Sequence, residues 1–212
     1  MSTDAHIPIP LDISGKSRIF LALVHHPVLN RQGQVVTTAI TNVDLHDLAR
    51  SGRTYGVDTV FVVTPVTLQQ RMVGQVLHHW TAGQGSSHTR RAEAIRHVTA
   101  VSSLQDAVQA IETQTGRAPL VAMTGAQMRA PNVDFQQIRQ LLLKAPEENS
   151  RSLLLVFGTG WGMTQDLIDT ADLRLPPILR DPLHAHRGGP YNHLSVRAAV
   201  AIALDRLLGE QK

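Results

Sequence analysis

The sequence predicts an α/β fold with a mostly parallel sheet and helices on both of its faces. Short apolar runs such as RIFLALV (18–24) and SLLLVFG (152–158) are typical of buried strands. They alternate with segments whose apolar residues recur at helical spacing, a pattern typical of parallel sheets covered on both sides. No internal repeat or linker divides the chain. One domain is therefore expected over 18–212, after a flexible or loosely docked extension of residues 1–17.

Six short apolar runs account for the expected sheet. Most of them lack a polar alternation, as expected where both faces of a strand are covered. The expected strands are 18–24, 58–64, 96–101, 118–124, 152–158 and 171–175.

Turn and cap residues begin and end the helices between those strands. Gly56 is a stop signal for the first helix, Thr64 is expected to cap the second, and Ser103 opens the third through a capping box. The polar, glycine-containing segment 82–94 is expected to be an exposed loop. The expected helices cover 42–56, 64–80, 103–111, 135–142, 164–170 and 193–208.

Composition is that of a folded protein with a single sizeable core. Of the 212 residues, 42% are hydrophobic and 17% are charged, which excludes a disordered chain. The N-terminus lacks the pattern of a secretory signal, and no apolar stretch approaches the roughly 20 residues that a membrane span needs. A cytoplasmic location without a membrane partner is expected. The formal net charge of +3 permits an anionic partner without requiring one.

Residue types exclude several kinds of chemistry. The chain has no cysteine, and therefore no disulfide, thiolate metal site or cysteine nucleophile. Its paired histidines, such as His25 with His26 and His78 with His79, follow no spacing that fixes a metal geometry, so no metal site is expected and surface or capping roles are favoured. The serine hydrolase elbow G-x-S-x-G is missing from the sequence.

A glycine-rich turn, FGTGWGM (157–163), follows a buried strand and precedes a helix. Doubly wound folds bind nucleotides at such positions, because glycines let a ligand approach the backbone and leave amide N–H groups free to bind it. The dinucleotide fingerprint G-x-G-x-x-G lies near the first strand and has an acidic residue about 20 positions on. Here the spacing is G-x-G-x-G, late in the chain, and Asp172 comes too soon. A tight turn without a ligand is the alternative.

The chain ends with a long connection and an apolar helix. Residues 176–192 show no periodicity, and ordered connections of this length tend to be functional. The helix 193–208 is apolar on nearly every side, which predicts burial on more than one side and packing against a second subunit.

Charged residues on the first helix are candidates for substrate binding. Arg50 and Arg53 could hold a phosphate or a ribose through paired hydrogen bonds. The alternative is a solvated face on which Asp44 and Asp47 pair with these arginines, and spacing alone favours it.

Together these motifs resemble a known family. LLLVFGTGWGM, ADLRLPPI and YNHLSVRAAVAIALDRLL resemble the SPOUT class of trefoil-knotted α/β RNA methyltransferases. The opening LALVHHPVLNRQGQVVTTAITNVDLHDLARSGRTYGV is similar to one subfamily, related to a domain fused to bacterial tRNA guanine-N1 methyltransferase. The resemblance extends over residues 18–209.

The resemblance implies a C-terminal trefoil knot that binds S-adenosyl-L-methionine, with S-adenosyl-L-homocysteine as the product. It implies a homodimer with the last helix at the interface and an RNA substrate, favoured as tRNA rather than DNA, spanning both subunits. The cofactor loops that it implies comprise Met123, Thr124, Gly125, Phe157, Gly158, Thr159, Gly160, Trp161, Gly162, Pro177, Ile178, Tyr191, Asn192, His193, Leu194 and Ser195.

For catalysis the resemblance implies three residues. Arg50 matches an arginine of ribose-methylating members and would hold the target ribose or phosphate. The position six residues before it, an asparagine in those members, is Asp44, and Asn42 lies two positions further back. Asp44 or His46 could take the proton.

Two further positions depart from the family pattern. The glycine turn lacks the carboxylate that is common in the family, and His193 stands where an asparagine is usual. Ribose 2′-O methylation is favoured over guanine-N1 methylation. The alternatives are a catalytically weak or inactive RNA-binding module or partner subunit and, more distantly, a nicotinamide-dependent oxidoreductase. Candidate contacts to the RNA backbone are Arg31, Arg90, Arg91 and Arg187.

Overall fold

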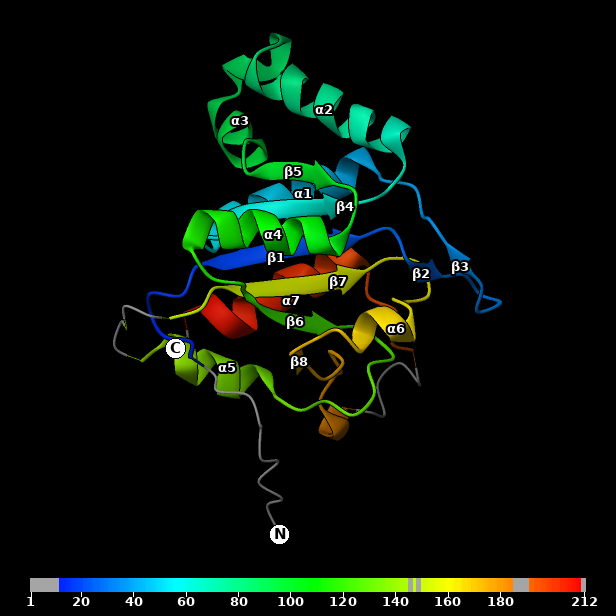
Figure 1. The fold of residues 1–212 in the computed structure, drawn as a ribbon, viewed down its shortest axis with the longest axis vertical. Coiled ribbons are helices and arrows are strands. Elements are labelled where there is room, and N and C mark those ends of the chain that lie inside the picture. The colour runs from blue at the N-terminus through cyan, green and yellow to red at the C-terminus, as the bar shows by residue number, and fades with distance from the viewer. Residues whose placement is uncertain (1–11, 145–146, 148–149, 185–190, 211–212) are drawn as a thin grey trace.

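A six-stranded parallel sheet forms the centre of the protein (Figure 1). The computed structural model describes residues 12–144, 147, 150–184 and 191–210. The strand order is β5-β4-β1-β7-β6-β8, and every pairing within this sheet is parallel. The strands are β1 (Ile19–Val24), β4 (Thr59–Val63), β5 (Val98–Val101), β6 (Leu120–Thr124), β7 (Leu153–Gly158) and β8 (Leu173–Arg174).

The strand order reverses beside β1. From β1 the chain moves outward to β4 and β5, and it then returns to fill the other side with β6, β7 and β8. The last residue of β1, Val24, pairs with Val63 of β4 and with Gly158 of β7. The carboxyl ends of these strands therefore lie at one edge, and such a switch point is where open α/β sheets bind ligands.

Helices cover both faces of the sheet, which confirms the predicted architecture (Figure 1). On one face lie α1 (Asn42–Thr54), α5 (Phe135–Leu142) and α7 (Val196–Leu208), and on the other lie α4 (Leu104–Thr115) and α6 (Gln165–Ile168). Leu48 of α1 and Leu204 of α7 are buried in the core on the first face of the sheet. Ile111 of α4 is buried in the core on the second face. These burials follow the helical spacing of the apolar residues.

A short hairpin that the sequence analysis missed stands at the carboxyl edge. Its strands β2 (Val28–Leu29) and β3 (Val35–Val36) pair antiparallel. The turn is held by Asn30, whose side-chain oxygen accepts from the amides of Gln32 and Gln34. Two-residue strands carry no periodicity, so the sequence gives no signal for them.

Between β4 and β5 the structure differs from the expected exposed loop. The segment 82–94 is not an exposed loop, because it contains η1 (Gln84–Ser87) and α3 (Thr89–Ile95), whose Ala92, Ala94 and Ile95 are buried. With α2 (Thr67–Thr81) these helices lie beyond the β5 edge of the sheet (Figure 1).

Thr64 does not cap α2. Its amide donates to Val101 O, which continues the β4–β5 pairing, and Val66 is the N-cap residue. Leu68, expected on the apolar face of this helix, is 73% exposed.

Residues 12–17 are docked against the domain rather than extended from it. Ile13 is 2% exposed, and the Ser14 hydroxyl accepts from the Glu147 amide at 2.9 Å. The Gly15 amide also donates to Lys144 O. Residues 12–17 are therefore docked and not flexible, and residues 1–11 of the expected extension lie outside the described part of the chain.

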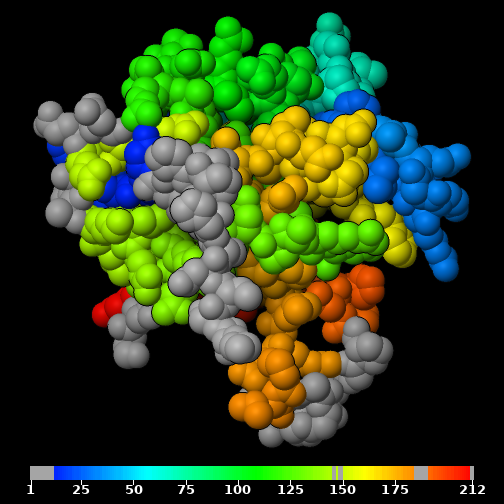
Figure 2. Space-filling model, turned by 60° about the horizontal axis from the view of Figure 1, so that its bottom comes forward, coloured from blue at the N-terminus to red at the C-terminus, as the bar shows by residue number. Residues whose placement is uncertain are grey.

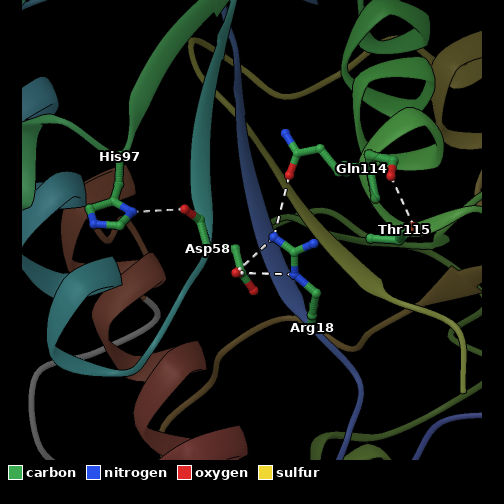
Figure 3. Close-up of polar contacts among 6 residues, drawn as sticks. Arg18, Asp58, His97, Gln114 and Thr115 are labelled. Atoms are coloured by element: carbon green, nitrogen blue, oxygen red, sulfur yellow. Dashed lines mark hydrogen bonds and ion pairs between the residues drawn. The ribbon is translucent and has the colours of Figure 1, made fainter. Parts of the chain in front are cut away.

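Polar contacts tie the strands together at the amino edge (Figure 3). Arg18, before β1, donates to the Asp58 carboxylate and also to Gln114 at the end of α4. His97 donates from Nδ1 to Asp58 O at 2.9 Å. These contacts fix the edge opposite the candidate site. In the described part of the chain, no helix is long and apolar enough to cross a membrane.

Candidate functional site

The glycine-rich turn after β7 forms the floor of the carboxyl edge. Gly160 and Gly162 have φ values of +60° and +108°, which favour glycine. A Cβ atom at Gly160 would lie 2.8 Å from Leu29 O, a backbone atom of the hairpin. Gly160 is therefore required both for its backbone conformation and for the close approach of β2.

Backbone hydrogen bonds join this turn to the hairpin. The Trp161 amide donates to Leu29 O, and the Leu29 amide donates to Gly162 O at 2.8 Å. Figure 2 shows the hairpin (blue) in contact with the yellow part of the chain, which comprises the turn after β7 and α6. The expectation that this turn leaves its amides free is wrong for Thr159, Trp161 and Gly162, because all three amides donate within the protein. The glycines serve first to seat the turn on the hairpin.

A buried chain of hydrogen bonds lies behind the turn. The Thr159 hydroxyl donates to Val24 O, so its oxygen accepts from the Thr38 hydroxyl, which in turn accepts from His25 Nδ1. This order leaves a proton on Nδ1 of a neutral His25 and none on Nε2. His25 Nε2 is buried without a hydrogen-bond partner among the described residues. Burial lowers the pKa of His25 to about 4, against the opposing effect of Asp44.

Three of the predicted cofactor segments meet at this edge. Thr124, the last residue of β6, pairs with Phe157 of β7. Its hydroxyl donates to Pro176 O at 3.2 Å, and the Leu175 amide donates to Met123 O. The structure therefore brings residues 123–125 and 157–162 beside the segment that leads into Pro177 and Ile178.

The fourth predicted cofactor segment, residues 191–195, lies on the surface. Tyr191 and Leu194 are 73% and 45% exposed, and the rings of Tyr191 and His193 are 5.0 Å apart. Asn192 is half-buried. Ser195 caps α7 by accepting from the Ala198 amide, so α7 begins at Val196 rather than at 193.

A groove of about 530 Å³ between α1 and α7 brings two predicted residues together. Arg50 of α1 and Ser195 before α7 line it, along with Asp47 and Arg197. Asn42 is exposed and lies about 12 Å along the helix axis from Arg50, since the two are eight residues apart. The structure therefore does not bring Asn42 and Arg50 together.

Asp44 is anchored within the protein. Arg197 donates from Nη1 to its Oδ1 at 2.8 Å, and the Thr41 hydroxyl donates to its Oδ2. Arg197 also lies 3.3 Å from the Asp47 carboxylate. Sequence reasoning missed Arg197, because nothing in SVRAAV indicates a partner 153 positions earlier. Both oxygens of the Asp44 carboxylate are thus engaged before any substrate binds.

His46 faces away from this groove. Its ring contacts Trp80 of α2 edge-on, with centroids 5.2 Å apart. Burial of the imidazole is the main cause that lowers the pKa of His46. The positive charges of Arg91 and Arg50 lower this pKa further. Among the basic residues predicted to contact RNA, Arg31, Arg90 and Arg91 are exposed, and Arg187 lies outside the described residues.

The carboxyl edge offers open backbone and an exposed aromatic side chain to an adenosine-type cofactor. Cβ atoms built at Gly125 and at Gly162 would meet no atom within 4 Å, so the backbone there borders open space. Trp161 is 48% exposed beside Gly162 and offers a flat apolar surface. Ligand sites combine apolar or aromatic side chains with a few backbone polar groups, so these residues are compatible with a bound nucleoside.

Comparisons with known proteins agree with this geometry. Residues 18–209 match a family model described as SAM-dependent RNA methyltransferase. A tRNA (guanine-N(1)-)-methyltransferase of Oleidesulfovibrio alaskensis is 38% identical over 193 residues, which are 91% of this chain and 42% of that protein. An uncharacterized protein of Aquifex aeolicus is 34% identical over 195 residues, 92% of this chain and 90% of that protein.

A solved structure shows the same fold. The SpoU methyltransferase AviRb from Streptomyces viridochromogenes, in complex with the cofactor AdoMet, aligns with a TM-score of 0.52 and 12% identity, covering 98% of this chain and 62% of that one. The fold is thus an α/β fold of the kind that this SpoU methyltransferase has. More narrowly, the chain belongs to the family of S-adenosylmethionine-dependent RNA methyltransferases. It spans less than half the length of the named tRNA methyltransferases that it matches.

Proposed function

We propose that this protein methylates tRNA at a ribose 2′-oxygen, with S-adenosylmethionine as the methyl donor. The observation that carries the proposal is the α1–α7 groove, where Arg50 and Arg197 stand together beside Ser195. Two guanidinium groups in one polar groove suit a phosphate or a ribose, because each presents a planar set of donors.

The lining of the groove supports a ribose target over a base. Enzymes that modify a base usually hold it by stacking against aromatic or apolar side chains. The aromatic residue here, Tyr55, donates its hydroxyl to Asp205 at 3.0 Å, and the other lining side chains are mainly charged, hydroxyl or small. Guanine-N1 methylation is the alternative, because relatives more than twice as long are named for it.

In the proposed reaction the chain orients the ribose and accepts its proton. When bound, S-adenosylmethionine supplies an electrophilic methyl group on sulfur. Arg50 would hold the ribose or the adjoining phosphate, since a guanidinium stays protonated and cannot act as a base. Both carboxylate oxygens of Asp44 are engaged by Arg197 and Thr41, whereas Asp47 faces the groove and has one oxygen 3.3 Å from Arg197 Nε. Asp47 is therefore proposed as the acceptor of the 2′-hydroxyl proton.

Residues of the carboxyl edge would hold the cofactor. Gly125 and the segment from Pro176 to Ile178 would supply backbone groups, Gly162 would leave room for the ligand, and Trp161 would supply an aromatic face. The proposal includes a single domain, a C-terminal trefoil knot, a homodimer formed through α7, and tRNA methylation in the cytoplasm. Residues Tyr191 and Leu194, exposed in one chain, would become covered in that dimer or by the cofactor.

Calorimetric titration with S-adenosylmethionine tests the cofactor site. We expect micromolar binding by the native protein and loss of binding in Gly160→Val, because the added side chain would displace the turn from Leu29 O. Gly116→Val is the matched control: Gly116 also has a positive φ, +79°, but it ends α4. No binding by the native protein would leave an inactive RNA-binding module or partner subunit as the better account.

Nucleoside analysis of methylated tRNA then tests the target. The native protein should yield a 2′-O-methyl nucleoside, and Arg50→Ala should lower the rate by at least about 100-fold through loss of positioning. A 1-methylguanosine product would overturn the ribose proposal while leaving the methyltransferase assignment intact.

A further inference from the structure

We propose that a basic groove on the outer face of α2 binds the sugar-phosphate backbone of the RNA substrate. This inference rests on the proposed function and extends it to a surface outside the α1–α7 groove. The groove has a volume of about 650 Å³, and its lining includes Arg71, Gly74, Gln75, His78, His79 and Gln84.

The charge of the chain is concentrated in this region. Residues 64–97, here called the α2–α3 lobe, contain four arginines and one acidic residue, for a formal net charge of +3. That equals the net charge of the whole chain, so the remaining residues carry no net formal charge. The acidic residue, Glu93, is already paired with Arg53 of α1. The lobe thus presents a positive surface, the ordinary electrostatic signature of nucleic-acid binding.

The lining residues lie on one face of α2. Arg71, Gln75 and His78 follow one another at three- and four-residue steps, the spacing of neighbours on a helix surface. All three are exposed, and each presents hydrogen-bond donors. A row of donors on a basic helix face suits phosphate oxygens, which accept hydrogen bonds and carry negative charge.

Gly74 opens the floor of the groove. It lies in the middle of α2, where glycine is unfavourable, and a Cβ built on it would meet no atom within 4 Å. Packing within the described chain therefore does not require a glycine here. Its consequence is an open path between Arg71 and His78 for a ligand that approaches the helix backbone.

Trp80 packs against His79, one of the residues that line the groove. Its ring is 5.0 Å from that of His79 and 5.8 Å from that of His88, and the Arg91 guanidinium lies 4.5 Å from its centroid. A Cβ at Gly85 would lie 2.6 Å from the indole, so η1 packs directly against it. Packing on both sides orients His79 and Arg91 in advance of binding, which lowers the entropic cost of association.

The lobe packs against α1, the helix that also forms one side of the α1–α7 groove. His46 of α1 contacts Trp80 and lies one helical turn before Arg50. The positive charges of Arg91 and Arg50 both lower the pKa of His46, so both guanidiniums lie near its imidazole. Helix α1 therefore links the lobe to the α1–α7 groove, and a single RNA molecule is proposed to contact both.

Direct binding of labelled tRNA to the native protein and to Gly74→Glu tests the groove. The new carboxylate would lie one turn from both Arg71 and His78, in open space. We expect tRNA affinity to fall about tenfold, and the slope of log affinity against log salt to decrease in magnitude by about 1. Arg71→Gln should change the slope in the same direction.

The matched control is Gln109→Glu, which makes the same change of charge at an exposed position of α4. Gly74→Ala should raise the melting temperature by about 2–4 °C and show that α2 accepts a side chain there. S-adenosylmethionine binding should be the same in all these variants.

Three outcomes distinguish a failure of the proposed RNA-binding groove from a failure of the proposed function. Weaker tRNA binding in Gly74→Glu and Arg71→Gln, but not in Gln109→Glu, would support the groove. Equal tRNA affinity in all variants, with methyl transfer retained, would overturn the groove alone. A native protein that binds S-adenosylmethionine but no tRNA would overturn both the groove and the RNA substrate.

Discussion

Arg197 Nη1 lies 2.8 Å from Asp44 Oδ1, and this contact joins the last helix to the first turn of α1. The Asp44 side chain is largely buried, at 9% exposed, and that of Arg197 is 36% exposed. The pair fixes the spacing of the two helices that form the groove around Arg50. It is therefore a structural contact at the entrance to the proposed ribose site.

Asp44→Asn should destabilise the fold. The change removes the charge that Arg197 meets and weakens the contact with Thr41, which should cost about 1–3 kcal/mol. Urea unfolding at pH 7 measures it. Asp47→Asn is the matched variant: because this carboxylate is exposed, the stability loss should stay below about 1 kcal/mol, whereas methyl transfer should fall steeply. Full activity in Asp47→Asn would exclude Asp47 as the proton acceptor.

Gly160→Ala should cost more stability than Gly116→Ala, although both glycines have a positive φ. The shared backbone strain is worth about 1–2 kcal/mol. At Gly160 the added Cβ also meets Leu29 O, whereas at Gly116 it meets no atom within 4 Å. Thermal unfolding of the two variants checks the difference, and equal losses would contradict the close seating of the turn on the hairpin.

His25 should make stability depend on pH between about 6.5 and 4. Its pKa is lowered in the folded state to about 4, so in this range the unfolded chain binds more protons. Stability from this residue is complete above pH 6.5 and is lost as the pH falls toward 4, by up to about 3 kcal/mol.

Urea unfolding of the native protein and of His25→Gln at pH 7, 5.5 and 4.5 measures this dependence. Glutamine does not titrate, so the difference in stability between the two proteins should shrink as the pH falls. A constant difference would show that His25 is not held neutral by its buried hydrogen-bond chain.

Ser195→Ala should destabilise α7 by about 1 kcal/mol, because the hydroxyl caps the helix by accepting from the Ala198 amide. Ser103→Ala removes a comparable cap from α4, far from the groove. Melting temperatures should fall by similar amounts in the two variants. If Ser195 also lies at the cofactor, S-adenosylmethionine affinity should fall in Ser195→Ala alone.

Apolar runs and cap residues predicted most of the fold. The strands at 18–24 and 152–158 were evident because residues buried on both faces form unbroken apolar runs, and Ser103 marked the start of α4 through its capping box. In contrast, α3 is short and its buried residues include two alanines, whose small apolar surface gives little signal. The hairpin was missed because it is held by hydrogen bonds to the glycine turn, which lies about 130 residues further along the chain.

The candidate site was predictable in its parts but not in their arrangement. The spacing of Gly158, Gly160 and Gly162 marked a special turn, yet it gave no sign that Leu29 O lies against it. Asp44 was singled out for its sequence position, and only the structure pairs it with Arg197. Contacts between distant segments depend on packing, which local patterns do not encode.

The central position of β1 has a consequence for synthesis. One edge of β1 pairs with β4 and its other edge pairs with β7. The first residue of β7 follows Ile19 by more than 130 positions, so the second edge is unpaired until β7 has been synthesised. At about 5–20 residues per second, a ribosome leaves that edge uncovered for about 7–27 seconds. The Arg197 partner of Asp44 emerges later still. Half-made chains therefore expose a long apolar edge, and the groove around Arg50 can form only after α7 has been synthesised.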